Sequence, residues 1–269
     1  MTAWLDIHRG TAPLVVSFPH TGTDIPPELE TAFVSPWLAR RDADWWVDQL
    51  YAFAHDLGAT TVRTRLSRSV IDCNRDPSGA SLYPGQTTTD LCPTETFDGA
   101  PLYAGAGPDE VEIARRRIAY FEPYHRALAG EIARLRELHP RIVLYDAHSI
   151  RSHVPRLFAG ELPQFNIGTN GGVTCAAALT NRVADICARS GQSYVVDGRF
   201  RGGWTTRHYG QPERGIHAIQ MELAMRGYMA EPRDPSPHNW PTPLDTAPLI
   251  TPILIDILTA CSHFAKGHS

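Results

Sequence analysis

Two histidines, His20 and His148, each follow a short apolar run and precede a small residue, Thr21 or Ser149. A neutral imidazole is a good zinc ligand, and a catalytic zinc takes three protein ligands with a fourth position open. Asp146 lies on the same side of an extended chain as His148 and could accept its second ring N–H. The pair therefore favours a metal site over the alternative that each histidine only hydrogen-bonds at a strand end.

We expect a carboxylate as the third ligand, and three aspartates are candidates. Asp42 and Asp44 stand just before a predicted helix, where aspartate is also common as a capping residue. Capping explains one of these two residues more easily than both. Asp24, four residues after His20, is the third candidate, and spacing alone does not choose among them.

Glu222 lies near the end of an apolar run, residues 219–223. An acid in a predicted buried strand requires either a partner or a chemical role. A glutamate near a zinc-bound water is the usual general base for amide hydrolysis. The alternative is an ion pair at the end of a strand, with an arginine such as Arg207.

Arginines close to these positions indicate recognition of an anion. Asn74 and Arg75 follow a predicted strand and place an amide beside a bidentate donor, which suits a substrate carboxylate. The alternative is a surface ion pair of Arg75 with Asp72 or Asp76. Arg68, seven residues earlier, could polarise a carbonyl group.

A glycine-rich segment, residues 201–210, concentrates further cationic and aromatic side chains and could approach an anionic ligand closely. It contains no GxGxxG pattern, and the chain has no P-loop, HExxH or GxSxG motif. Dinucleotide binding, phosphoryl transfer and a serine triad are therefore unsupported.

Alternating strands and helices must position these residues. Apolar runs predict strands at 13–19, 141–145 and 217–223, and shorter strands at 60–65, 69–72 and 193–197. Helical spacing predicts helices at 45–57, 109–138, 174–189 and 249–265, with Pro123 kinking or splitting the second. Segments 77–107, 201–210 and 231–246 are predicted loops, and the first is long enough to be a functional lid.

This alternation predicts an α/β fold, a mixed and largely parallel twisted sheet with helices on both faces. Ligands of such sheets bind beyond the carboxyl ends of the strands. Because His20, His148 and Glu222 all lie at or near predicted strand ends, we expect these distant parts of the chain to converge on one site.

The chain has 269 residues without an obvious linker or repeat, which predicts one domain over 1–269. The net charge of −4 does not favour a nucleic acid or an anionic membrane as partner. No run approaches the roughly 18 apolar residues of a membrane span.

Five dispersed cysteines and no signal-peptide pattern lead us to expect a cytoplasmic protein. Lys266 is the only lysine, which argues against a lysine nucleophile.

Six groups of residues carry a resemblance to a known family: Ser17–His20, Asp42–Trp45, Ile71–Arg75, Asp146–His153, Gly202–Gly210 and Gln220–Leu223. In this order they resemble the N-formylglutamate amidohydrolase family, which acts in histidine degradation, over residues 14–228. The strings Asp-Ala-His-Ser-Ile-Arg-Ser-His and Thr-Arg-His-Tyr-Gly are the specific part of this resemblance. The family is distantly similar to zinc carboxypeptidases and aspartoacylases, which implies a zinc carboxypeptidase-like sheet and one zinc or other divalent metal.

The resemblance also implies roles for single residues. His20, His148 and Asp44 would bind the metal, with Asp42 in reserve, and Glu222 would activate water. The chain departs from carboxypeptidases, which carry His-x-x-Glu, because residue 23 is threonine.

For the substrate, the resemblance implies that Arg75 with Asn74 grips a carboxylate and that Arg68 steadies the oxyanion. The implied reaction is hydrolysis of N-formyl-L-glutamate, a small molecule with two carboxylates, for which Arg151 and Arg207 are further binding candidates. The alternatives are a hydrolase of another N-acyl amino acid on the same fold, and a non-catalytic protein that binds small dicarboxylates. The sequence makes no prediction of the oligomeric state.

Overall fold

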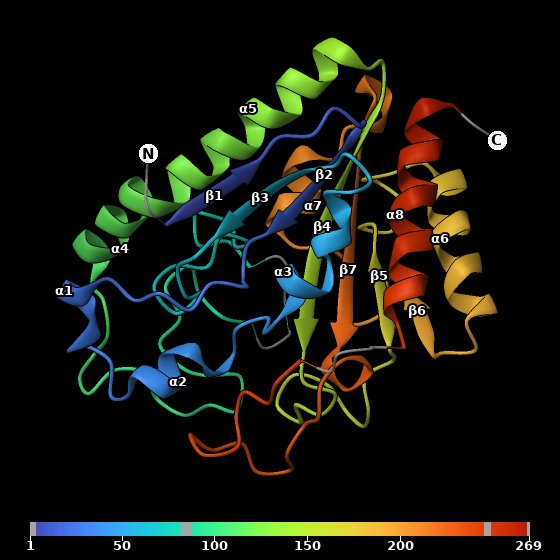
Figure 1. Ribbon diagram of the computed structural model, residues 1–269. Helices are drawn as coiled ribbons and strands as arrows, with labels where there is room; N and C mark the ends of the chain where they lie inside the picture. The colour runs from blue at the N-terminus through green and yellow to red at the C-terminus, as the bar shows by residue number, and fades with distance from the viewer. Residues whose placement is uncertain (1–3, 82–84, 86–87, 245–248, 268–269) are drawn as a thin grey trace.

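The computed structural model describes residues 4–81, 85, 88–244 and 249–267. In this part of the chain seven strands form one sheet: β1 (Leu5–His8), β2 (Leu14–Phe18), β3 (Thr60–Thr64), β4 (Ile142–Ile150), β5 (Phe165–Gly168), β6 (Tyr194–Val196) and β7 (Ile216–Ala224). Their order is β1-β3-β2-β4-β7-β5-β6. The four central strands are parallel, whereas β1 and β5 run antiparallel to their inner neighbours. The predicted mixed, largely parallel sheet is confirmed (Figure 1).

Helices cover both faces of the sheet. Figure 1 shows α4 (Glu110–Arg116) and α5 (Glu122–Leu138) on one side, and α6 (Ala177–Arg189) and α8 (Thr251–Lys266) on the other. Shorter helical segments are α1 (Pro27–Glu30), α2 (Pro36–Arg41), α3 (Val47–Leu50), η1 (Ala52–Ala54), η2 (Arg117–Phe121), α7 (Trp204–Tyr209), η3 (Pro212–Arg214) and η4 (Met225–Gly227).

The central strands are buried on both faces, as expected of a parallel sheet covered by helices. Every residue of β4 is buried. Val143 and Tyr145 pack into the apolar cluster with α6 and α8, whereas Ile142 and Leu144 pack with α5. Because side chains alternate along a strand, Asp146 and His148 project on the α5 face. The candidate site therefore lies on that face, near the carboxyl end of β4.

Two predicted elements are wrong. Segment 69–72 is not a strand: the Val70 N–H donates to the Ser67 carbonyl, and the chain turns there. Segment 201–210 is not wholly a loop, because Trp204–Tyr209 forms α7. The glycines of that segment lie outside the helix, where Gly202 has a φ of 109° that side chains disfavour.

The predicted helix at 45–57 is shorter and interrupted. Trp46 adopts a left-handed conformation, with φ 65°, so the α-helix covers only Val47–Leu50 and is followed by the 3-10 turn Ala52–Ala54. A kink or split was predicted at Pro123. The structure has a π-helical turn, Arg117–Phe121, just before this proline, between α4 and α5. Proline lacks the N–H of a helical bond, and the wider turn lets the helix continue.

The strand at 141–145 is longer than predicted and continues to Ile150, so His148 lies inside it. Strands β1 and β5 were not predicted. Segment 77–107 contains neither helix nor strand in its described residues, in agreement with the loop prediction; 82–84 and 86–87 lie outside them. Loop 231–246 likewise contains neither helix nor strand in its described residues, 231–244.

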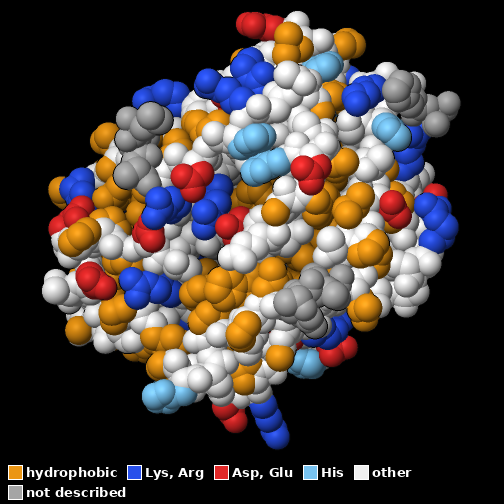
Figure 2. Space-filling view, viewed as in Figure 1, with side chains coloured by type: hydrophobic (Ala, Val, Ile, Leu, Met, Phe, Trp, Pro, Cys, Tyr) orange, Lys and Arg blue, Asp and Glu red, His pale blue; other side chains and the backbone are white. Residues whose placement is uncertain are grey.

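On the face shown in Figure 2, basic and acidic side chains lie interspersed among apolar ones. Among the described residues, no helix combines the length and apolar character that crossing a bilayer requires.

Candidate metal centre and active site

His20, Asp44 and His148 form a buried cluster, with exposed fractions of 3%, 1% and 2%. His20 follows β2, Asp44 lies between α2 and α3, and His148 lies in β4. Their potential ligand atoms all lie within 4.8 Å of one another. His148 Nδ1 is 3.1 Å from His20 Nδ1 and 3.0 Å from Asp44 Oδ2, and His20 Nδ1 is 3.7 Å from that oxygen.

Backbone hydrogen bonds fix Asp44 between the two histidines. Its N–H donates to the His20 carbonyl at 3.0 Å, and its Oδ2 accepts from the Ser149 N–H at 3.2 Å. The Tyr228 hydroxyl connects Ser149 Oγ, at 2.7 Å, to the carbonyl of Trp45, at 2.9 Å. The chain on both sides of the cluster is thus held in place by residues distant in sequence.

A second carboxylate supports each histidine. His20 Nε2 donates to Asp72 Oδ1 at 2.7 Å, and His148 Nε2 donates to Asp146 Oδ2 at 2.9 Å. Such bonds keep the Nε2 proton in place, so that Nδ1 carries the lone pair. The role predicted for Asp146 agrees with this geometry. Sequence reasoning missed Asp72 as the partner of His20 and considered it only as an ion-pair partner of Arg75.

The donor set fits a divalent metal ion. Two Nδ1 lone pairs and one carboxylate oxygen converge, and these groups repel one another unless a cation lies between them. Two ligand atoms of a tetrahedral zinc lie roughly 3.3 Å apart, and the observed separations are 3.0 to 3.7 Å. Asp44 Oδ1 is also buried without a hydrogen-bond partner among the described residues.

The electrostatics of the cluster favour positive charge. Burial opposes ionisation of Asp44, but the neighbouring His148 and His20 hold its pKa below the usual value. Burial likewise disfavours a charged His148, yet Asp146 and Asp44 raise its pKa well above the ordinary range. The cluster therefore stabilises a cation at this position, whether a proton or a metal ion.

The other two candidate aspartates have different partners. Asp42 Oδ2 accepts from the Phe97 N–H at 2.6 Å, and its Oδ1 is 3.5 Å from Arg41 Nε. Asp24 is half-exposed and lies 3.2 Å from Arg65 Nε. Of the three carboxylates left open by spacing, the structure brings only Asp44 to the histidines.

Glu222 lies in β7 as the register partner of His148 in β4. It is 7% exposed, and burial raises its pKa to about 8, with His148 opposing and Asp44 reinforcing the shift. A carboxyl group with a raised pKa can accept and return a proton near neutral pH.

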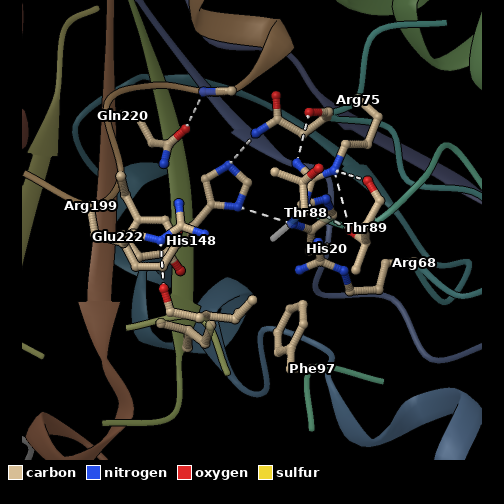
Figure 3. A pocket seen from close by; sticks show the side chains of 15 residues that line it. His20, Arg68, Arg75, Thr88, Thr89, Phe97, His148, Arg199, Gln220 and Glu222 are labelled. Carbon is tan, nitrogen blue, oxygen red and sulfur yellow. Dashed lines mark hydrogen bonds between the residues drawn. The ribbon is translucent and has the colours of Figure 1, made fainter. Parts of the chain in front are cut away.

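A cavity opens beside the cluster (Figure 3). Figure 3 shows Glu222 and Arg199 on one side of His148, and Arg75 and Arg68 on the other. The lining residues also include polar and apolar groups from several loops: His20, Asn74, Thr88, Thr89, Phe97, Ile150, Leu157, Phe200, Gly203 and Gln220.

Arg68 and Arg75 reach the cavity and share the buried carboxylate of Asp72. Arg68 Nη2 donates to Asp72 Oδ2 at 2.6 Å, and Arg75 Nε lies 3.6 Å from the same oxygen. Arg75 also donates to Thr89 Oγ1 at 2.9 Å, and Arg68 lies 4.8 Å from the centre of the Phe97 ring. Burial opposes ionisation of Asp72, but Arg75, His20 and Arg68 hold its pKa well below the usual value.

The Asn74 side chain contacts residues that support the metal-binding cluster. Its Nδ2 donates to Asp146 Oδ2 at 3.0 Å and lies 2.9 Å from His148 Nε2, and its Oδ1 accepts from the Thr205 N–H at 2.8 Å. A Cβ at Gly203 would come within 2.4 Å of the Asn74 amide. The absence of a side chain at Gly203 thus permits the close approach of α7 that fixes Asn74. Asn74 was predicted to bind a substrate carboxylate, whereas in the structure its amide contacts Asp146 and His148.

Two predicted substrate-binding arginines do not line this cavity. Arg151 Nη2 contacts Asp98 Oδ2 at 2.8 Å, and Arg207 Nε donates to the Gly202 carbonyl at 2.9 Å. Arg199 lines the cavity instead, and sequence reasoning missed it. Its position near the end of β6 was the available signal, since strand β6 was predicted at 193–197.

The fold and the cluster together define an α/β protein with a buried His–Asp–His candidate metal centre at the carboxyl ends of its central strands. A profile of the N-formylglutamate amidohydrolase family matches residues 12–229. The chain belongs to this family.

Named relatives agree with this placement. The chain is 47% identical over 229 residues to an N-formylglutamate deformylase of Pseudomonas aeruginosa, covering 84% of this chain and 86% of the relative. It is 45% identical over 229 residues to one of Pseudomonas putida, covering 84% and 85%. The crystal structure of an N-formylglutamate amidohydrolase from Ralstonia eutropha matches 98% of both chains with a TM-score of 0.79 and 22% identity.

Proposed function

We propose that this chain hydrolyses N-formyl-L-glutamate to formate and L-glutamate, a step of histidine degradation, with a metal ion held by His20, Asp44 and His148. The buried cluster beside a cavity that contains Glu222 and arginines carries this proposal. The identity of 47% to a protein named N-formylglutamate deformylase supports the choice of substrate.

A divalent ion bound by the three residues would supply Lewis-acid polarisation of the formyl oxygen and would lower the pKa of a water molecule. Zinc suits the two imidazoles and one carboxylate. Asp72 and Asp146 orient the two imidazoles through their Nε2 protons.

Glu222 acts as the general base and then as the general acid. It takes a proton from water as the water oxygen bonds to the formyl carbon, and it returns that proton to the departing amine as the carbon–nitrogen bond breaks. A cation in the cluster favours the ionised form of Glu222, which burial by itself disfavours.

The arginines on the His20 side of the cavity bind negative charge. Arg68 stabilises the oxyanion of the tetrahedral intermediate, and Asp72 together with the Phe97 ring fixes its guanidinium group. Arg75, held by Thr89, binds the α-carboxylate of the substrate.

The test is formate release from N-formyl-L-glutamate by protein stripped with a chelator and then given zinc or another divalent metal. We expect activity to disappear on stripping and to return with the metal. Absence of formate with every metal would refute the proposed reaction. N-acetyl-L-glutamate and short peptides as comparison substrates would then identify a different amide hydrolase, whereas tight binding of glutamate without turnover would identify a binding protein.

A further inference from the structure

The cavity has one wall of mixed character. Ile150, Leu157 and Phe200 belong to an apolar cluster separate from the two main cores, and all three line the cavity together with Arg199. Apolar side chains with one cation suit a ligand segment that is itself part hydrocarbon and part anion.

Arg199 is held against this wall. Its Nε donates to the Leu157 carbonyl at 2.8 Å, and its guanidinium carbon lies 5.3 Å from the centre of the Phe200 ring. The preceding turn is fixed by Asp197, which accepts from the N–H of Thr169 at 2.7 Å. The guanidinium is therefore positioned by the fold before any ligand arrives, which lowers the entropic cost of binding an anion.

Arg75 lies across the cavity from Arg199, on the other side of His148 (Figure 3). The two arginines therefore offer two separate positions for carboxylates. An N-acylglutamate carries one carboxylate next to the carbon that bears the scissile nitrogen, and a second one beyond two methylene groups. Only the second has a hydrocarbon segment that would pack on Ile150, Leu157 and Phe200.

We propose that Arg199 binds the side-chain carboxylate of the substrate and sets the preference for glutamate over neutral N-formyl amino acids. This inference rests on the proposed function and adds to it the residue that determines specificity. Arg75 binds the α-carboxylate that all N-formyl amino acids share.

The test compares kcat/KM for N-formyl-L-glutamate and N-formyl-L-glutamine in the metal-loaded wild type and in Arg199→Met. Glutamine keeps the two methylenes and lacks the charge. A charge-assisted hydrogen bond contributes roughly 10- to 150-fold in binding. We expect Arg199→Met to lower kcat/KM for the glutamate substrate by this factor, mainly through KM, and that for the glutamine substrate by less than about threefold.

Two variants serve as controls. Arg75→Gln should lower kcat/KM for both substrates alike, and Arg189→Met, an exposed position on α6, should change neither. Because the readout is a ratio between two substrates, a variant that folds poorly lowers both values and leaves the ratio unchanged. An unchanged ratio in well-folded Arg199→Met, or a wild type that does not distinguish the two substrates, overturns the inference. A wild type inactive on N-formyl-L-glutamate with every metal refutes the proposed function instead.

Discussion

His148 and Glu222 are register partners in the parallel strands β4 and β7. Neighbouring strands lie about 4.8 Å apart, so sheet hydrogen bonds set the spacing between a proposed metal ligand and the proposed base. Both strands are buried along nearly their whole length. The pair thus lies in two buried central strands, whereas Arg68, Arg75 and Arg199 lie in loops.

The Glu222→Gln variant tests whether Glu222 is the general base or a metal ligand. The amide keeps the size of the side chain and cannot accept the proton of water, so we expect kcat to fall by about 100- to 10,000-fold. Metal content, measured by elemental analysis, should stay at the wild-type value. Loss of the metal in this variant would reassign Glu222 as a ligand.

Asp44→Asn and Asp42→Asn form a matched pair two residues apart. Asp44 faces both histidines, whereas Asp42 bonds to the Phe97 N–H. We expect Asp44→Asn to abolish stoichiometric metal binding and Asp42→Asn to retain it, as measured by titration of the stripped protein. Equal metal binding by the two variants would contradict the assignment of Asp44.

Asn74→Ala tests whether Asn74 positions His148 or binds substrate. Its amide contacts Asp146 and His148, and loss of such supporting bonds lowers metal affinity by about 10- to 100-fold. Thr89→Ala is the matched control, because Thr89 holds Arg75 and should affect KM without changing metal affinity. Unchanged metal affinity with raised KM in Asn74→Ala would restore the carboxylate-binding role that the sequence predicted.

We expect His125 to make the free energy of unfolding depend on pH. Its Nε2 donates to the Cys73 carbonyl at 2.8 Å, and burial lowers its pKa from 6.5 to about 3. Between these values the unfolded chain binds the proton and the folded chain does not, so the free energy of unfolding falls as pH decreases below 6.5. The slope is about 1.4 kcal/mol per pH unit.

Urea unfolding of metal-loaded protein between pH 5 and 7.5 would measure this slope. The His125→Asn variant should have a lower stability at neutral pH and a flatter pH dependence below 6.5, by about 1.4 kcal/mol per pH unit. Parallel curves for the wild type and the variant would show that His125 does not carry the effect.

The apolar runs of the sequence predict the four central parallel strands, β2, β3, β4 and β7, and the convergence of His20, His148 and Glu222. Continuous apolar runs specify buried parallel strands, and parallel strands bring their carboxyl ends to one edge whatever lies between them in the sequence. The motif strings predicted the family, which the match over residues 12–229 confirmed.

The contacts made by turns and loops depend on the tertiary structure. Spacing left Asp24, Asp42 and Asp44 equivalent, because a turn can direct a side chain either way, and the bonds to His20 and Ser149 select Asp44. Likewise, the resemblance pointed to Arg151, and nothing in the sequence singled out Arg199, which lines the cavity.

Arg199 lines the cavity, where its Nε donates to the Leu157 carbonyl, whereas Arg151 contacts Asp98. Hydrophobic periodicity predicts which face of a strand is buried, but it does not predict long-range polar contacts. Those contacts depend on side chains that meet only after the chain has folded.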